Sequence, residues 1–216
     1  MASSKKSTTN KSAPRLEVKK TFKLFINGAF PRSESGRVYE VSSNKSGFIA
    51  NPCLASRKDL RDAVVAARSA QSGWAKATAY NRGQILYRIA EMLEGRADQF
   101  ASEISLASGV TAKKAHDEVL AAIDRWVWYA GWSDKLSAAF GATNPVSGPY
   151  YNFTIPEPQG VIAVAPAESF LAFIDAIAPA IVSGNTVVAL VPGSAAIVAM
   201  SFAEVLATSD LPAGVM

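Results

Sequence analysis

The chain has 216 residues, of which 49% are hydrophobic and 19% are charged, and its formal net charge is +4 at pH 7. This length suits one large domain or two small ones, and the apolar share is large enough to build a core. A single cysteine cannot form an internal disulfide and a single histidine excludes most metal clusters, so we expect a cytoplasmic protein without a metal site.

The N-terminal residues predict no targeting or membrane segment. Residues 1–20 are rich in Ser, Thr and Lys with few large apolar side chains, which predicts a disordered basic tail. We interpret this tail as a solvated run and expect no nucleic-acid binding, because no aromatic residues alternate with the lysines. The tail contains no apolar signal-peptide core, and Asp175 and Pro179 interrupt the longest apolar stretch, so we expect no membrane span.

The folded part is predicted to begin with short strands. Phe22–Ile26 followed by Asn27–Gly28 predicts a strand that enters a hairpin turn, since Asn-Gly accepts the positive φ of tight turns. A returning strand is expected near Phe30, and another strand is expected at Val38–Val41.

Apolar residues at helical spacing then predict four consecutive helices. They are a helix over Ser56–Gln71 with an acidic first turn at Asp59, a helix from an N-cap at Asn81 to Gly95, a short helix stopped by Gly109, and a long helix from an N-cap at Thr111 to about Phe140. Trp126 and Trp128 on the long helix cannot share one face, so we expect at least one to be partly exposed or to face a partner.

The second half of the chain predicts an α/β fold with a Rossmann-like parallel sheet. Gly160–Pro166 and Thr186–Val191 are apolar runs that suit strands buried on both faces. Phe170–Val182 between them predicts a buried helix, and Ser194–Ala207 predicts another. Two parallel strands joined by such a crossover imply a right-handed connection. Tyr150–Ile155 alternates and is aromatic, which favours an exposed or edge strand.

Several short motifs occur together in a characteristic order. They are Phe25–Gly28, Asn51–Pro52, Pro158–Ile162, Ala178–Ala180, Ser183–Val188 and Leu211–Val215. In this order and spacing they resemble the first half of an aldehyde dehydrogenase over residues 22–216. The resemblance implies an incomplete aldehyde dehydrogenase fold over residues 21–216, with NAD or NADP as the cofactor of an oxidoreductase that acts on aldehydes.

The resemblance assigns no catalytic residue to this chain. In the family, the nucleophilic cysteine and the glutamate base both lie downstream of the matched segment. Cys53 is the only thiol, and it has no His or cationic cluster around it in sequence, so we expect a structural role. His116 lies on a charged helix face, where we expect a surface residue.

The family places an asparagine that binds the oxyanion in a Pro-Trp-Asn turn after the first buried strand. The alignment puts Glu168, Ala167 or Ser169 at this position, depending on where it is anchored, and none of the three is Asn. A carboxylate there would repel an oxyanion, whereas Ser169 could donate a hydrogen bond.

After the second strand, the family has a lysine and a glutamate that hold the adenosine ribose. Leu190 and Gly193 fall there, or Val191 and Ser194 in a register shifted by one. The resemblance therefore implies weak cofactor binding, and it identifies no cofactor-binding residue in this chain.

Two functions from different classes remain open. The chain is either an aldehyde dehydrogenase subunit or fragment, or a non-catalytic module that binds a complete aldehyde dehydrogenase. We expect association with itself or with such an enzyme through Tyr150–Ile155, because the family uses the corresponding strand for oligomerisation. Two strands are also too few to cover both faces of their helices. The sequence selects neither the substrate aldehyde nor NAD over NADP.

Overall fold

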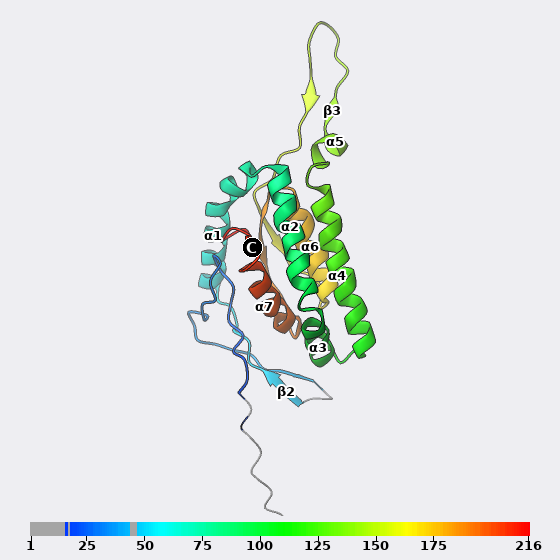
Figure 1. Cartoon of the computed structure of the whole chain (residues 1–216). Helices are drawn as coiled ribbons and strands as arrows, with labels where there is room; N and C mark the ends of the chain where they lie inside the picture. Colours follow the sequence, from blue (N-terminus) through cyan, green and yellow to red (C-terminus); the bar gives the residue numbers. More distant parts are fainter. Residues whose placement is uncertain (1–15, 17, 44–46) are drawn as a thin grey trace, which may run out of the picture.

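The computed structural model describes residues 16, 18–43 and 47–216, so the predicted tail lies mostly outside the described residues. The helices are α1 (Arg57–Lys76), α2 (Ala79–Glu94), α3 (Ala97–Ser108), α4 (Ala112–Trp132), α5 (Leu136–Phe140), α6 (Phe170–Val182) and α7 (Ala195–Leu206). The strands are β1 (Val41–Ser43), β2 (Gly47–Ala50), β3 (Ala142–Thr143), β4 (Phe153–Thr154), β5 (Val161–Val164) and β6 (Thr186–Ala189). Helices surround the β5–β6 pair, and the hairpin of β3 and β4 projects from one end (Figure 1).

The N-terminal turn forms as predicted. Asn27 and Gly28 both have positive φ, at 54° and 72°, and Ile26 bridges Ala29 across the turn. The flanking strands are reduced to this bridge and to a hydrogen bond from the Leu24 amide to Pro31. A strand begins at Val41, within the predicted region, and pairs with β2, which the sequence analysis did not predict.

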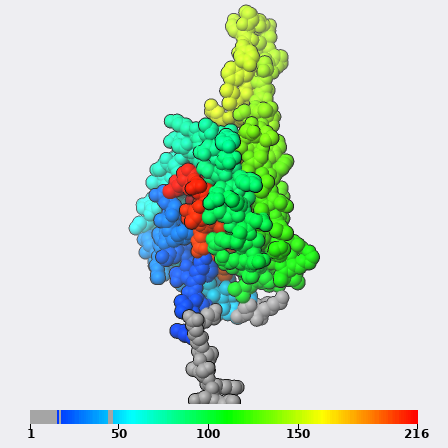
Figure 2. All heavy atoms as spheres, in the orientation of Figure 1, coloured from blue at the N-terminus to red at the C-terminus, as the bar shows by residue number. Residues whose placement is uncertain are grey.

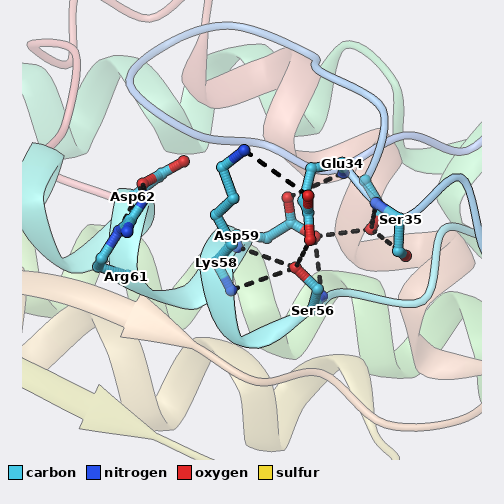
Figure 3. A network of polar contacts seen from close by, with 8 residues as sticks. Glu34, Ser35, Ser56, Lys58, Asp59, Arg61 and Asp62 are labelled. Atoms are coloured by element: carbon cyan, nitrogen blue, oxygen red, sulfur yellow. Dashed lines mark hydrogen bonds and ion pairs between the residues drawn. The ribbon is translucent and has the colours of Figure 1, made fainter.

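The start of α1 is fixed by a buried carboxylate (Figure 3). Ser56 caps the helix, and Asp59 accepts hydrogen bonds from the Ser56 amide at 2.8 Å, the Ser33 hydroxyl at 2.7 Å and the Glu34 amide at 3.2 Å. Burial pushes the pKa of Asp59 upward, but these hydrogen bonds outweigh it and leave the pKa below its ordinary value. Asp59 thereby joins the helix to the loop that precedes β1.

The remaining helix ends confirm some predictions and correct others. Thr111 caps α4 and Gly109 ends α3 in the left-handed conformation, both as predicted. The N-cap at Asn81 is wrong, because the Thr78 side chain accepts from the Asn81 amide and α2 begins two residues earlier. The long helix to Phe140 is also wrong, since α4 ends at Trp132 and α5 is a separate short helix.

The β5–β6 pair is parallel, with Val161 opposite Thr186 and Val164 opposite Ala189. The Thr186 hydroxyl donates to the Ala67 carbonyl of α1 at 3.0 Å, whereas Val187 lies in the core with α6. Because neighbouring side chains of a strand point to opposite faces, α1 and α6 cover opposite faces of β6. β6 is buried as predicted, but β5 is only partly buried and Ala163 is exposed, so the prediction of burial on both faces is wrong for β5.

Aromatic side chains form the centre of the main core, where the helices meet. The Phe202 ring of α7 lies 5.6 Å from Phe170, 6.1 Å from Phe173 and 5.8 Å from Trp126. α4 contacts α2, α3 and α6, while α7 contacts α2, α3 and α6. The expectation that α6 and α7 would lack cover took account of the two strands alone. Other helices cover most of the surface of α6 and α7.

The hairpin of β3 and β4 stands clear of the helical body (Figure 2). Of the predicted strand Tyr150–Ile155, Phe153 and Thr154 form β4 and lie opposite Thr143 and Ala142, and the Asn152 carbonyl accepts from the Asn144 amide at 2.8 Å. The exposed position of this segment is confirmed: the side chains of Tyr151 and Phe153 remain 76% and 53% exposed.

Candidate functional site

The candidate site lies at the carboxyl ends of β5 and β6. In open α/β sheets, ligands bind in the crevice outside this edge, where strands lead into helices. Here residues 165–169 connect β5 to α6, and residues 190–194 connect β6 to α7. These two loops contain every position that the family resemblance selected for the oxyanion and the ribose.

An apolar groove of about 490 Å³ opens beside this edge. Its walls come from both loops, from the segment that precedes β1, and from α1 and α7. Leu190 projects into solvent at its rim and is 51% exposed. Lys23 is the only basic residue that lines the groove within the described residues.

A smaller cavity of about 220 Å³ lies between the N-terminal ends of α6 and α7. Its polar lining comes from Ser108, Glu118, Glu168, Ser169 and Ser194, and apolar residues of α3, α6 and α7 supply much of the remainder. Within the described part of the chain, no lysine, arginine or histidine lines it. The chemistry of this cavity is therefore acidic.

Glu118 of α4 supplies the carboxylate at the start of α6. Its Oε1 accepts from the Ser169 hydroxyl at 2.8 Å and from the Leu171 amide at 3.1 Å. Ser169 in turn caps the helix by accepting from the Ala172 amide at 3.2 Å. The free amides and positive dipole end of a helix N-terminus favour such an anion. The Ser169 hydroxyl, the only donor that the sequence analysis proposed for an oxyanion, thus donates to Glu118.

Glu168 lies against the turn that starts α7. Gly193 has a φ of +52°, and a Cβ added there would meet the Glu168 carboxylate oxygen at 2.2 Å, so the carboxylate fills the space of a side chain. The Tyr39 hydroxyl donates to the Gly193 carbonyl at 3.0 Å. Burial, and then the charge of Glu168, raise the pKa of Tyr39. Tyr39, Gly193 and Glu168 therefore form one polar cluster at this end of the sheet.

Each of the two alternative registers for the ribose-binding residues places side chains on these hollows. Leu190 lines the groove, Ser194 lines the cavity, and Val191 lines both. None of the three carries a charge, and Gly193 has no side chain to offer. Neither register places a lysine or a glutamate on the loop after β6.

The remaining candidate residues, Cys53 and His116, lie at two different hollows. Cys53 is half-buried, bridges Val38 and lies on the groove wall, which the sequence pattern did not indicate. His116 is exposed, as predicted, and lines a different surface hollow beside Ser43 and Asp98. Among the described residues, no group of three His, Cys, Asp or Glu side chains is placed to hold a metal ion.

The tryptophans of α4 divide as the helical spacing requires. Trp126 is fully buried, whereas Trp128 is 51% exposed. The Trp128 and Trp132 rings contact each other at 5.6 Å, and Trp132 also lies 6.5 Å from Phe140. This aromatic surface lies next to the projecting hairpin rather than at the sheet edge. In the part of the chain that the structure describes, no helix is both long and apolar enough to cross a bilayer.

The fold defines an α/β protein built on a parallel strand–helix–strand–helix unit, and comparison with known proteins identifies the family. The model of the aldehyde dehydrogenase family matches residues 30–216, so the chain belongs to this family. It is 35% identical to human retinal dehydrogenase 2 over 210 residues, which cover 94% of this chain and 40% of that protein.

Solved structures agree with this assignment. The fold is similar to HpcC from Thermus thermophilus, with a TM-score of 0.87, 27% identity and coverage of 91% of this chain and 38% of that chain. It is also similar to an aldehyde dehydrogenase from Bacillus cereus in complex with NAD+, with a TM-score of 0.83, 29% identity and coverage of 91% of this chain and 40% of that chain. The chain thus spans about 40% of the length of these relatives, and its fold is an incomplete aldehyde dehydrogenase fold.

Sequence reasoning did not identify the roles of Tyr39 and Glu118. Glu118 lies 51 residues before its partner Ser169, and Tyr39 lies 154 residues before Gly193. Both look like ordinary surface or strand residues in their local sequence. No local signal marks them, because only the tertiary fold brings them to the edge.

Proposed function

We propose that this chain supplies the first part of the cofactor-binding domain of an NAD(P)-dependent oxidoreductase that acts on aldehydes. The observation that carries the proposal is the β5–α6–β6–α7 unit, because a groove opens at the carboxyl ends of its strands. The chain belongs to the aldehyde dehydrogenase family, and one similar structure is an aldehyde dehydrogenase in complex with NAD+. The single cysteine leads us to propose the reducing cytoplasm as its location.

We propose that the 216-residue chain by itself does not oxidise aldehydes. The reaction needs a thiolate that adds to the carbonyl and a base that activates water for hydrolysis of the thioester. Cys53 is the only thiol and is held in a bridge with Val38, and His116 lies at a different surface hollow. Neither residue has a partner here that would complete this chemistry.

The residues at the edge do not fit a dinucleotide well. A dinucleotide carries two phosphates, which are stabilised by cations or by free helix amides. Glu118 and Glu168 carry negative charge beside both helix starts, and Leu190 and Gly193 offer no grip on a ribose. We therefore expect NAD to bind at millimolar concentration or more weakly, which corresponds to about 4 kcal/mol.

The test is an assay of the purified chain with several aldehydes and with NAD or NADP, together with titration calorimetry. We expect no turnover above background and no binding at micromolar concentrations. Because Cys53 lies on the groove wall, the Cys53→Ala variant is measured in parallel. Turnover that disappears in Cys53→Ala would contradict the proposed inactivity of the isolated chain, and micromolar NAD binding would contradict the expected weak cofactor binding.

The second candidate function is that of a non-catalytic module that assembles with another chain, and the hairpin favours it. The Tyr151 and Phe153 rings lie 5.3 Å apart on one face of the hairpin, and both are exposed. Within the described residues, β4 pairs with β3 on one side only. An unpaired edge with exposed aromatics is a template for strand pairing. The proposed partner is a second copy or a complete aldehyde dehydrogenase.

The assembly proposal is tested with Phe153→Lys, and with Tyr87→Lys as the control. Tyr87 is an aromatic residue on α2 that is 55% exposed, so its replacement adds the same charge at a distance from the hairpin. Light scattering and co-purification with a complete homologue measure association. We expect Phe153→Lys to abolish it and Tyr87→Lys to retain it. Association that survives Phe153→Lys would exclude pairing through this edge.

A further inference from the structure

A carboxylate that the family resemblance does not explain lies against the turn between β6 and α7. Glu168 belongs to the preceding loop, between β5 and α6, yet its carboxylate contacts Gly193. Gly193 is two residues before α7, whose first residue is Ala195. The negative charge therefore lies beside the end of α7 that carries the partial positive charge of the helix dipole.

Three features position the loop that carries this carboxylate and the turn that it faces. The next residue, Ser169, is fixed by its hydrogen bond to Glu118, so the loop that carries Glu168 is anchored to α4. The Gly193 carbonyl accepts from Tyr39, so the opposite wall is anchored to the N-terminal segment. Gly193 leaves the space that the carboxylate fills, at a backbone φ of +52° that favours glycine.

From these contacts we propose that Glu168 is a specificity-determining residue, whose negative charge excludes nucleotide phosphates from the start of α7. The inference rests on the proposed function, because it assumes that the sheet edge receives a nucleotide. It goes further by assigning the weak binding to one charge. A neutral nucleoside is then accepted better than its phosphorylated forms, since only the phosphates meet the repulsion.

The sign of the salt dependence distinguishes this arrangement from an ordinary phosphate site. Binding of a phosphate by cations weakens as salt is added, because salt screens the attraction. Repulsion by Glu168 is screened in the same way, so ADP binding to the unmodified chain becomes tighter with added salt. In Glu168→Gln this increase becomes smaller, because only the charge of Glu118 remains in the cavity.

The experiment titrates adenosine, ADP and NAD into the full chain, into Glu168→Gln and into Glu168→Ala. Glu157→Gln is the control, because Glu157 is an exposed carboxylate in the loop before β5 that lines neither hollow at the sheet edge. We expect both Glu168 variants to bind ADP and NAD about fivefold to tenfold more tightly, a modest factor because Glu168 is exposed. Adenosine affinity and the Glu157→Gln variant remain unchanged.

Each other result contradicts a defined part of the reasoning. Equal ADP affinity of the unmodified chain and Glu168→Gln would overturn the role of Glu168. It would leave unaffected the proposal that a nucleotide binds at the carboxyl ends of β5 and β6. Tighter binding in Glu168→Ala alone would show that bulk, not charge, excludes the phosphate, and would also overturn the inference. If adenosine, ADP and NAD bind to no variant, the proposed nucleotide edge is wrong and the inference fails with it. Thermal unfolding of each variant shows that the fold is retained.

Discussion

Replacement of Arg82 by methionine tests how α2 is joined to the ends of α1 and α6. The guanidinium donates from Nε to the Val182 carbonyl at 3.1 Å, and from Nη1 to the carbonyls of Ala75 and Ala77. Val182 is the last residue of α6, and Ala77 is the C-cap of α1. One side chain of α2 thus satisfies the carbonyl ends of two other helices, where a cation also complements the helix dipoles.

The magnitude follows from these contacts. A hydrogen bond that involves a charged group contributes about 1.5–3 kcal/mol, but Arg82 is only partly buried and water replaces part of what is lost. We expect Arg82→Met to lower the free energy of unfolding by about 2–3 kcal/mol, or the melting temperature by about 5–10 °C for a domain of this size. Arg82→Lys keeps the charge without the planar fork, so about half of the loss is expected.

Urea and thermal unfolding followed by circular dichroism, at one fixed protein concentration, measure these differences. Arg88→Met is the matched control on the same helix, because Arg88 is exposed and, within the described residues, pairs only with Glu91 one turn away. Such a surface pair is worth about 0.2–0.5 kcal/mol. If Arg82→Met and Arg88→Met destabilise the chain equally, the guanidinium does not join the three helices as described.

Two further changes probe buried polar contacts. Asp59→Asn should lower the free energy of unfolding by about 1–3 kcal/mol at pH 7. Because folding lowers the pKa of Asp59, its stabilisation is present above pH ~4 and fades as the pH falls through the folded-state pKa. Unfolding curves from pH 2 to 7 check this, and a constant difference from the unmodified chain would contradict it. Trp74→Phe removes the bond from the indole N–H to the Ile181 carbonyl at 2.9 Å and should cost about 1–2 kcal/mol, whereas Trp128→Phe should be nearly neutral in the same urea titration.

The sequence predicted those parts of the fold whose causes are local. The capping pair of Ser56 and Asp59, the N-cap at Thr111 and the left-handed Gly109 each act within one helical turn. The parallel β5–β6 pair also followed from two apolar runs with a helix between them. In all these elements, the residues that set the structure lie close together in the chain.

One error occurs where two local signals competed, and another where a distant residue decides the structure. Both Thr78 and Asn81 are capable N-caps, and the structure uses Thr78, whose side chain accepts from the amide of Asn81. The apolar pattern continues beyond Trp132, but the backbone leaves the α4 helix at Ser133, which is buried against Gly83 of α2. A Cβ at Gly83 would meet the Ser133 hydroxyl at 2.4 Å, so this close approach depends on a residue 50 positions away in the chain.

The candidate site could be located from the sequence but its chemistry could not. The order of strands and helices places the loops 165–169 and 190–194 at one edge. The sequence also showed that Glu168 is acidic, but not that its carboxylate contacts Gly193. Glu118 reaches the same edge from α4, because α4 packs along α6. The two carboxylates become one feature only through this packing.

The structure removes one of the two physical reasons for expecting association. That reason assumed that α6 and α7 would lack cover, yet most of their apolar side chains are buried among α2, α3 and α4. The apolar surface that lacks cover belongs instead to Tyr151 and Phe153 of the hairpin, and to the partly exposed β5. Among the described residues, β6 pairs with β5 on one side, and its Val187 amide donates to the Val215 carbonyl on the other. In contrast, β5 pairs with β6 alone. Unpaired backbone groups at a strand edge favour strand addition. We therefore propose that association uses backbone pairing at the edge of β4, and we expect substitutions on the outer faces of α2 and α4 to leave it unchanged.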